Sequence, residues 1–145
     1  MAKEILPAEN IKLNVSLNSR DEAIREAGKI LVEGGYTDEA YIDKMFEREE
    51  ITSTFMGNSV AIPHGTDDAK ESVHYSGLSL IQVPEGVEYG DGNTVKLIFG
   101  IAGKNNEHLE ILSKIAILCS DEDNVEKMIQ ATSKDELLEM FKEVE

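Results

Sequence analysis

Segments with the apolar spacing of β-strands alternate along this chain with segments that have the spacing of α-helices. Residues 11–17 alternate apolar and polar side chains, and residues 75–84 and 94–103 are two longer apolar runs, so all three predict strands. Helices are expected at six places: after Ser19 as far as Gly34, after Thr37 as far as Glu50, briefly over 67–72, over about 105–119, around 125–129, and after Ser133. This interleaving predicts an α/β fold in a single domain, residues 1–145, with a mixed β-sheet flanked by helices on both faces.

Capping patterns set several of the expected boundaries. Ser19 followed three residues later by Glu22 is a capping box, and Gly34 and Gly35 predict the end of the same helix. Ser133 with Glu136 predicts another capped helix start. Residues 85–93 are rich in glycine and predict a turn region between the two long strands.

Residues 51–63, which precede His64, are rich in Thr, Ser and β-branched residues. It predicts a loop that leads into a short strand, 59–62. Thr66 is expected to cap a short helix over 67–72, whose free N–H groups and positive dipole end could receive an anion.

The predicted helix over 105–119 is unusually apolar, which indicates that it is largely buried. Its apolar stripe comprises Leu109, Leu112, Ile115, Ala116 and Cys119, widened by Ile111 and Leu118. Cys119 is the single cysteine of the chain, and its apolar surroundings predict a small buried side chain rather than a reactive thiol.

A formal net charge of -15, with 14 basic residues, makes nucleic acid and anionic membranes poor partners, since the overall field repels polyphosphate. A protein partner with a basic face is favoured. No apolar segment approaches the roughly 20 residues of a membrane helix, and the N-terminal segment has no apolar core of a signal peptide. The sequence therefore predicts a cytoplasmic protein without membrane insertion.

His64 follows Pro63 at the end of a predicted strand, and ligands collect at the carboxyl ends of strands in α/β sheets. Pro63 restricts the backbone, and Gly65 has no Cβ to obstruct an approaching group. A neutral imidazole has an available lone pair near pH 7. His64 is therefore a candidate nucleophile or base, although a histidine that only caps a turn fits the same pattern.

The other two histidines have different surroundings. His108 lies in the first turn of the predicted helix over 105–119, directly after a strand end and a glycine. It would share a pocket with His64 if the helix packs beside that strand, or it would bond only to nearby backbone. His74 precedes a strand and is expected to face solvent.

Several kinds of site have no support in this sequence. The histidines are far apart, and there is no His-x-x-x-His or Cys-x-x-Cys spacing, so a metal site is not expected. No Gly-x-Ser-x-Gly elbow indicates a serine hydrolase. Phosphate-binding glycine loops of the Walker or dinucleotide type are also absent. The sequence predicts no metal and no other cofactor.

A longer motif surrounds His64. Glu49 is followed after six residues by Met56-Gly57, then after two more by Val60-Ala61-Ile62-Pro63-His64-Gly65. In this motif the chain resembles the mannitol/fructose-type enzyme IIA proteins of the bacterial sugar phosphotransferase system. The resemblance extends from about Ile11 to the C-terminal helix, and the segment FGIAGKNNEHLEILSKIA is more similar to the mannitol branch than to the fructose or nitrogen-regulatory branches.

The resemblance implies a phosphocarrier of sugar uptake. His64 would accept a phosphoryl group from the phosphorylated histidine-containing phosphocarrier protein and pass it to a cysteine of the mannitol-specific IIB domain. His108 and Arg48 match a second histidine and an arginine that line the family's site. Asn58 departs from the acidic residue of some relatives, which leaves the role of that position open.

The chemistry of phosphoryl transfer leads to further expectations about the site and its partners. Phosphoryl transfer needs positioning and electropositive groups, which Arg48, a protonated His108 and a helix start could supply. We expect Nε2 of His64 to attack, with Nδ1–H held by a backbone carbonyl. Docking is expected to use an apolar rim at Pro63–Gly65 among acidic residues. The alternatives are a regulatory phosphoprotein of the same fold, a fructose-specific IIA and, with little support, a histidine-dependent hydrolase.

Overall fold

The computed structural model describes residues 4–142, and within them the strands form one sheet of five in the order β1-β4-β5-β3-β2. The strands are β1 (Ile11–Lys12), β2 (Phe55–Gly57), β3 (Val60–Ala61), β4 (Gly77–Gly90) and β5 (Asn93–Ala102). β4 and β5 form a long antiparallel hairpin; β1 joins β4 and β3 joins β5 in parallel, while β2 is antiparallel to β3. The expected mixed sheet is confirmed. The ends of the predicted domain, residues 1–3 and 143–145, lie outside the described residues.

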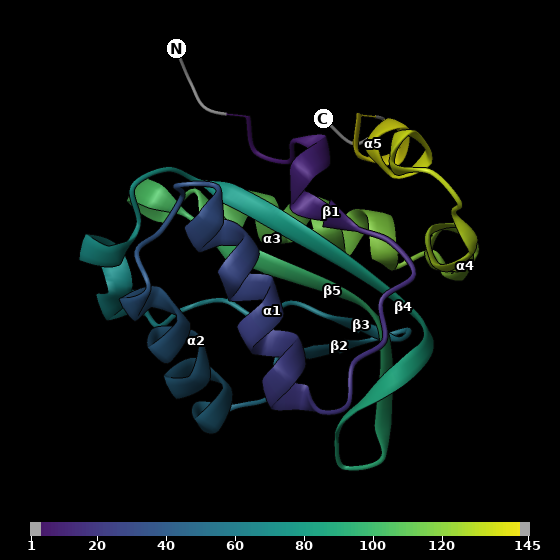
Figure 1. Cartoon of the computed structure of the whole chain (residues 1–145), viewed down its shortest axis with the longest axis horizontal. Coiled ribbons are helices and arrows are strands. Elements are labelled where there is room, and N and C mark those ends of the chain that lie inside the picture. Colours follow the sequence, from purple (N-terminus) through teal and green to yellow (C-terminus); the bar gives the residue numbers. More distant parts are fainter. Residues whose placement is uncertain (1–3, 143–145) are drawn as a thin grey trace.

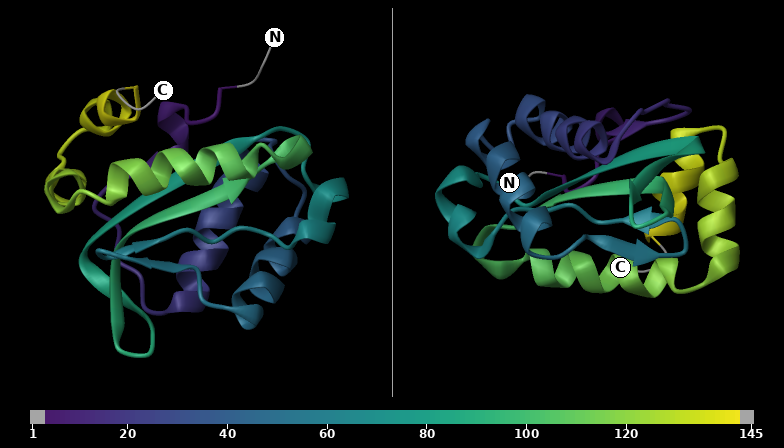
Figure 2. Two further views of the ribbon diagram at one scale, coloured as in Figure 1. Left: turned by 180° about the vertical axis from the view of Figure 1, so that it is seen from behind. Right: turned by 90° about the horizontal axis from the view of Figure 1, so that it is seen from below.

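Helices cover both faces of this sheet, as the sequence predicts (Figures 1 and 2). On one face lie α1 (Arg20–Glu33) and α2 (Ala40–Ile51); on the other lie α3 (His108–Cys119), α4 (Glu122–Gln130) and α5 (Lys134–Lys142). Short 3-10 helices span η1 (Ala8–Asn10), η2 (Asp67–Ser72) and η3 (Lys104–Asn106).

The two central strands are buried on both sides, which explains their nearly continuous apolar sequence. Alternate residues point to opposite faces, so Ile81 and Ile98 pack in the core under α1 and α2. Leu80 and Phe99 pack in the second core, under α3, α4 and α5. The sheet therefore separates two apolar cores, and its position is fixed by both.

The capping predictions for α1 are confirmed. The Ser19 hydroxyl accepts a hydrogen bond from the Glu22 N–H at 3.1 Å, and the Glu22 carboxylate accepts one from the Asn18 N–H at 2.9 Å. The helix ends at Gly34, and Gly35 has a φ of 81°, a conformation that glycine adopts without strain. The Ser133–Glu136 pair at the start of α5 is also confirmed, with a hydrogen bond of 3.3 Å.

The prediction that residues 85–93 form a turn region is wrong. β4 continues to Gly90, and the turn consists of Asp91 and Gly92, with φ values of 54° and 78°. A two-residue Asp-Gly turn with positive φ suits a tight hairpin. The glycine at 86 lies where the register between β4 and β5 shifts, so it accommodates a bulge within the strand.

Three other elements differ from expectation. Regular pairing of the predicted strand 11–17 ends after Lys12, since Asn14 has a φ of 53°. The Val15 N–H still donates to the Gln82 carbonyl at 2.9 Å, and burial alternates through residue 17. β2 lies inside the segment that predicted only a loop. η2 is a 3-10 helix, and the Thr66 hydroxyl donates to the Asp68 carboxylate rather than capping the backbone.

The apolar helix α3 is buried along one side only. Ile111, Ile115 and Leu118 are buried, as is Cys119, whose thiol pKa is raised to about 12 by burial. Leu109 is 59% exposed and Ile117 is 64% exposed, and Ala116 is exposed as well. The prediction of a largely buried helix is therefore wrong, while that of a buried cysteine is confirmed. Among residues 4–142, no helix is long and apolar enough to cross a membrane.

Candidate active site

His64 lies just beyond β3, where β3 and its parallel neighbour β5 both approach their carboxyl ends. The Ile101 N–H donates to the Pro63 carbonyl at 3.0 Å, and His64 forms an isolated parallel bridge with Ile101. The sheet thus holds the backbone on the N-terminal side of His64. Ligand sites of α/β sheets form at such strand ends.

The tautomer of the His64 ring follows from one hydrogen bond. Nδ1 lies 2.8 Å from the carbonyl oxygen of Ile62. A carbonyl only accepts hydrogen bonds, so Nδ1 carries the proton and Nε2 of the neutral ring keeps its lone pair. The geometry agrees with the predicted tautomer.

Burial lowers the pKa of His64 from its ordinary value of 6.5. The hydrogen bond to the Ile62 carbonyl opposes this effect, and the positive charges of Arg48 and His108 lower the pKa further. The carboxylate of Glu49 raises it by a smaller amount. The net result is a ring that stays neutral, with its lone pair available, at neutral pH.

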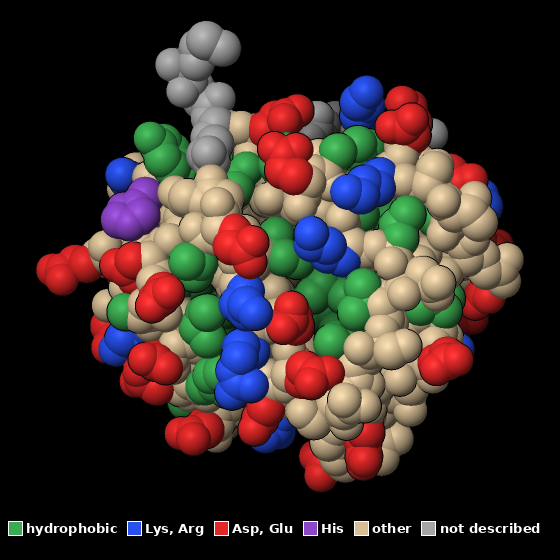
Figure 3. Space-filling view, viewed as in Figure 1, with side chains coloured by type: hydrophobic (Ala, Val, Ile, Leu, Met, Phe, Trp, Pro, Cys, Tyr) green, Lys and Arg blue, Asp and Glu red, His purple; other side chains and the backbone are tan. Residues whose placement is uncertain are grey.

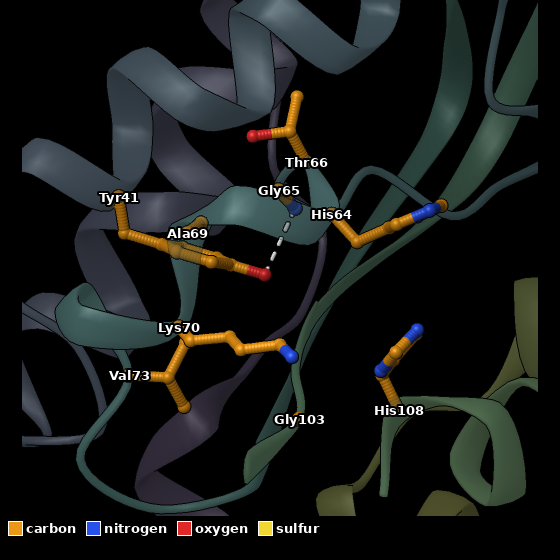
Figure 4. Close-up of a pocket in the computed structure, with 9 residues that line it drawn as sticks. All are labelled: Tyr41, His64, Gly65, Thr66, Ala69, Lys70, Val73, Gly103 and His108. Atoms are coloured by element: carbon orange, nitrogen blue, oxygen red, sulfur yellow. Dashed lines mark hydrogen bonds between the residues drawn. The ribbon is translucent and has the colours of Figure 1, made fainter. Parts of the chain in front are cut away.

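The structure brings His108 into the same pocket as His64. His108 is the first residue of α3, is half-buried, and points from the helix start toward the His64 ring (Figure 4). Gly103 makes this approach possible, because a Cβ at that position would lie 2.1 Å from the His108 backbone nitrogen. The absence of a side chain at Gly103 therefore lets the end of β5 meet the start of α3.

Arg48 lies in the last turn of α2 and does not line the pocket. Its Nη1 donates to the Thr52 carbonyl at 2.8 Å, across the C-terminus of the helix. Its positive charge nevertheless lowers the pKa of His64, as described above. Next to it, Glu49 is buried, and its carboxylate accepts from the Thr54 N–H at 3.0 Å and the Thr54 hydroxyl at 2.6 Å.

The pocket beside His64 is formed by segments far apart in the sequence (Figure 4). Its lining comprises Tyr41, His64, Gly65, Thr66, Ala69, Lys70, Val73, Gly103 and His108. Among residues 4–142, no group of three or more His, Cys, Asp or Glu side chains could hold a metal ion. The side chains of the lining offer an imidazole lone pair at His64 and a positive charge at Lys70.

The sequence profile described as "Phosphoenolpyruvate-dependent sugar phosphotransferase system, EIIA 2" matches residues 4–144. This chain belongs to that enzyme IIA family. The mannitol-specific phosphotransferase enzyme IIA component of Bacillus subtilis is 61% identical over 141 residues, which cover 97% of this chain and 99% of the relative.

Two solved structures from Escherichia coli share the enzyme IIA fold. One is a solution structure of enzyme IIAMTL in complex with phosphorylated enzyme IIBMTL, with a TM-score of 0.89 and 39% identity over 96% of this chain and 99% of that chain. The other is a crystal structure of IIA mannitol, with a TM-score of 0.87 and 41% identity over 93% and 97% of the two chains.

Asn58, whose role the sequence leaves open, does not line the pocket. Its side-chain amide donates to the Cys119 carbonyl at 3.0 Å, at the C-terminus of α3. Asn58 precedes β3 and His64 follows it, so the two residues lie at opposite ends of this strand. In this enzyme IIA chain, position 58 ties the β2–β3 hairpin to α3.

One expectation about the surroundings of His64 is wrong, and a second is opposed by a nearby carboxylate. The space above Gly65 is not open to a ligand, because the Tyr41 ring occupies it, 2.6 Å from where a Cβ would lie. The start of η2 carries the carboxylate of Asp68, whose pKa is lowered by the hydrogen bond from Thr66. This carboxylate, which also pairs with Lys44 at 3.4 Å, would repel an anion at the same helix start.

Sequence reasoning missed Tyr41 and Lys70 among the pocket residues of this enzyme IIA chain. Lys70 lies in a charged run that reads as a solvent-exposed face, and it is exposed. Tyr41 lies on the apolar side of α2, where a tyrosine is usually a core residue. Only the hydroxyl distinguishes Tyr41 from an ordinary core residue, because a buried hydroxyl needs a hydrogen-bond partner. His74 is exposed and outside the pocket, as expected.

Proposed function

We propose that this protein is a mannitol-type phosphocarrier of sugar uptake. In this function His64 accepts a phosphoryl group from the phosphorylated histidine-containing phosphocarrier protein and passes it to a cysteine of the mannitol-specific IIB domain. The single observation that supports this best is the bond from Nδ1 of His64 to the Ile62 carbonyl, because it leaves Nε2 unprotonated. Such a nitrogen is a nucleophile that needs no further activation.

The reaction requires two transfers at one atom. In the first, a P–N bond forms at Nε2 of His64 while the P–N bond of the donor histidine breaks. In the second, a cysteine thiolate of IIB attacks, and the P–N bond of His64 breaks. Negative charge spreads over the phosphoryl oxygens in both transition states. His108 and Arg48 are the proposed sources of the positive charge that stabilises it.

Docking of both partners would use the surface around His64. Pro63 itself is buried, so it contributes little to the apolar rim expected around residues 63–65. Exposed apolar side chains lie instead at Ile51, which ends α2, and at Leu109, next to His108. On the face that carries α1 and α2, acidic side chains are scattered with Lys and Arg among them (Figure 3). The net charge of -15 favours partners with basic surfaces.

The cytoplasm is the location that this function requires, because phosphoenolpyruvate supplies the phosphoryl group there. The test is reconstitution with phosphoenolpyruvate, enzyme I and the phosphocarrier protein, followed by addition of mannitol- or fructose-specific IIB. The protein should become labelled and then transfer its label to mannitol-specific IIB faster than to fructose-specific IIB. Faster transfer to the fructose protein would overturn the assigned sugar, and failure with both would favour a regulatory phosphoprotein.

A further inference from the structure

One buried hydroxyl connects the backbone on either side of the candidate active site. The Tyr41 hydroxyl lies 2.6 Å from the Ile101 carbonyl oxygen. It also lies 2.8 Å from the Gly65 nitrogen, as Figure 4 shows. Since the carbonyl can only accept, the hydroxyl donates its proton to Ile101 and accepts from the Gly65 N–H. Burial raises the pKa of Tyr41 to about 12, so this proton is present at neutral pH.

The hydroxyl takes the place of a bond that a regular sheet would make. His64 is bridged in parallel to Ile101, and the Ile101 N–H already donates to Pro63. In a regular parallel ladder the next bond would run from the Gly65 N–H to the Ile101 carbonyl. Here the Tyr41 oxygen is inserted between those two groups. The chain therefore separates from β5 one residue after His64.

The Tyr41 ring adds a second restraint on the same residue. It packs where a side chain at position 65 would begin, with its nearest carbon 2.6 Å from an ideal Cβ. Gly65 is thus held by its amide and by the ring that covers it. On the other side of His64, the Pro63 carbonyl is held by β5. The backbone of His64 is restrained at both neighbours.

We propose that Tyr41 is a positioning residue for phosphoryl transfer: its hydroxyl fixes the backbone at Gly65 and so sets the place of the His64 ring. This inference rests on the proposed function. Tyr41 does not need to touch the phosphoryl group, because its one proton and an acceptor lone pair are already used. A misplacement of about 1 Å at a reacting atom can slow a reaction by about 100-fold.

The experiment compares the phosphorylation rate of the full chain with that of Tyr41→Phe, well below the melting temperature. Phenylalanine keeps the ring over Gly65 and removes both hydrogen bonds. We expect kcat for phosphorylation by the phosphocarrier protein to fall about 10-fold or more, while the KM for that protein stays within roughly 2-fold. A residue needed only for fold stability would not change kcat while the protein is folded.

Tyr36→Phe is the matched control, because it removes another buried tyrosine hydroxyl, one that donates to the Glu4 carbonyl. It should leave kcat unchanged. Gly65→Ala provides a second variant: its Cβ would push the Tyr41 ring away, so it should also lower kcat. In the double variant Tyr41→Phe/Gly65→Ala the two losses should combine less than multiplicatively, since both act through one displacement.

The results that contradict the inference are distinct. A folded Tyr41→Phe protein with the kcat of the unmodified chain would overturn it, as would an equal fall in the Tyr36→Phe control. A Tyr41→Phe protein that is unfolded at the assay temperature would also overturn it, because the hydroxyl would then be required for the fold. If the unmodified chain is not labelled at all, the proposed function fails, and this inference fails with it.

Discussion

Nδ1 of His64 lies 2.8 Å from the carbonyl oxygen of Ile62, a residue two positions earlier in the same chain. Because Pro63 lies between them and is held by β5, the ring and its acceptor are fixed in one short backbone unit. This relationship determines which nitrogen faces outward. It also makes the site's behaviour with pH predictable.

The pKa of His64 is expected to lie below 6.5 in the folded protein, because burial and the charges of Arg48 and His108 outweigh the bond to Ile62. A titration of the ring followed by NMR measures it. Between the folded pKa and 6.5 the unfolded chain binds more protons at this residue than the folded one. His64 should therefore reduce the free energy of unfolding as pH falls below 6.5. A folded pKa above 6.5 would contradict this prediction.

Glu49→Gln should lower the pKa of His64 further, because the Glu49 carboxylate raises it. The same change weakens the bonds from the Thr54 N–H and hydroxyl, so the free energy of unfolding should fall by about 1–3 kcal/mol. NMR titration and chemical denaturation check the two effects. An unchanged or raised pKa in a folded variant would show that Glu49 does not act on the ring electrostatically.

His108→Ala should leave a folded protein that exchanges phosphoryl groups slowly. Loss of one group that stabilises a transition-state charge typically costs about 100-fold or more in rate. His74→Ala is the matched control, because His74 is exposed and does not line the pocket. Transfer rates from the phosphocarrier protein measure both. Equal rates in the two variants would remove His108 from the proposed mechanism.

Asn58→Ala should reduce stability without changing phosphoryl transfer. The variant loses the bond to the Cys119 carbonyl and places alanine at a φ of 50°, which together should cost about 2 kcal/mol. Asn58→Gly loses the same bond without the conformational strain, so it should be the less destabilised of the two. Thermal denaturation and the transfer rate test this. A slower transfer in folded Asn58→Gly would place position 58 in the site after all.

Local sequence signals predict a structural feature correctly where the residues of one segment determine it. The capping pair Ser19–Glu22 and the strand-end position of His64 depend on neighbouring residues, and both were predictable. The glycines of 85–93 indicated a turn, but bulges use glycine as well, and only pairing with β5 distinguishes the two. Local signals therefore give elements more reliably than their boundaries.

The sequence indicates the proposed reacting residue, His64, but not the residues that support it. His64 lies in the motif that the chain shares with the family, His108 and Arg48 are implied by the same resemblance, and the structure brings the two histidines into one pocket. The function of Tyr41 depends on a bond to Ile101, 60 residues away, and on the register of β3 against β5. No local pattern contains that information. The exposed face of α3 was missed because apolar residues at Leu109 and Ile117 resemble core residues in sequence.

The central claim is that Nε2 of His64 carries the phosphoryl group. The most direct measurement is NMR of the 15N-histidine-labelled protein after phosphorylation by phosphoenolpyruvate, enzyme I and the phosphocarrier protein. The account predicts a single phosphohistidine, at His64, with phosphorus bonded to Nε2 and the proton on Nδ1. A phosphate on Nδ1 of His64, or on any other residue, would contradict it.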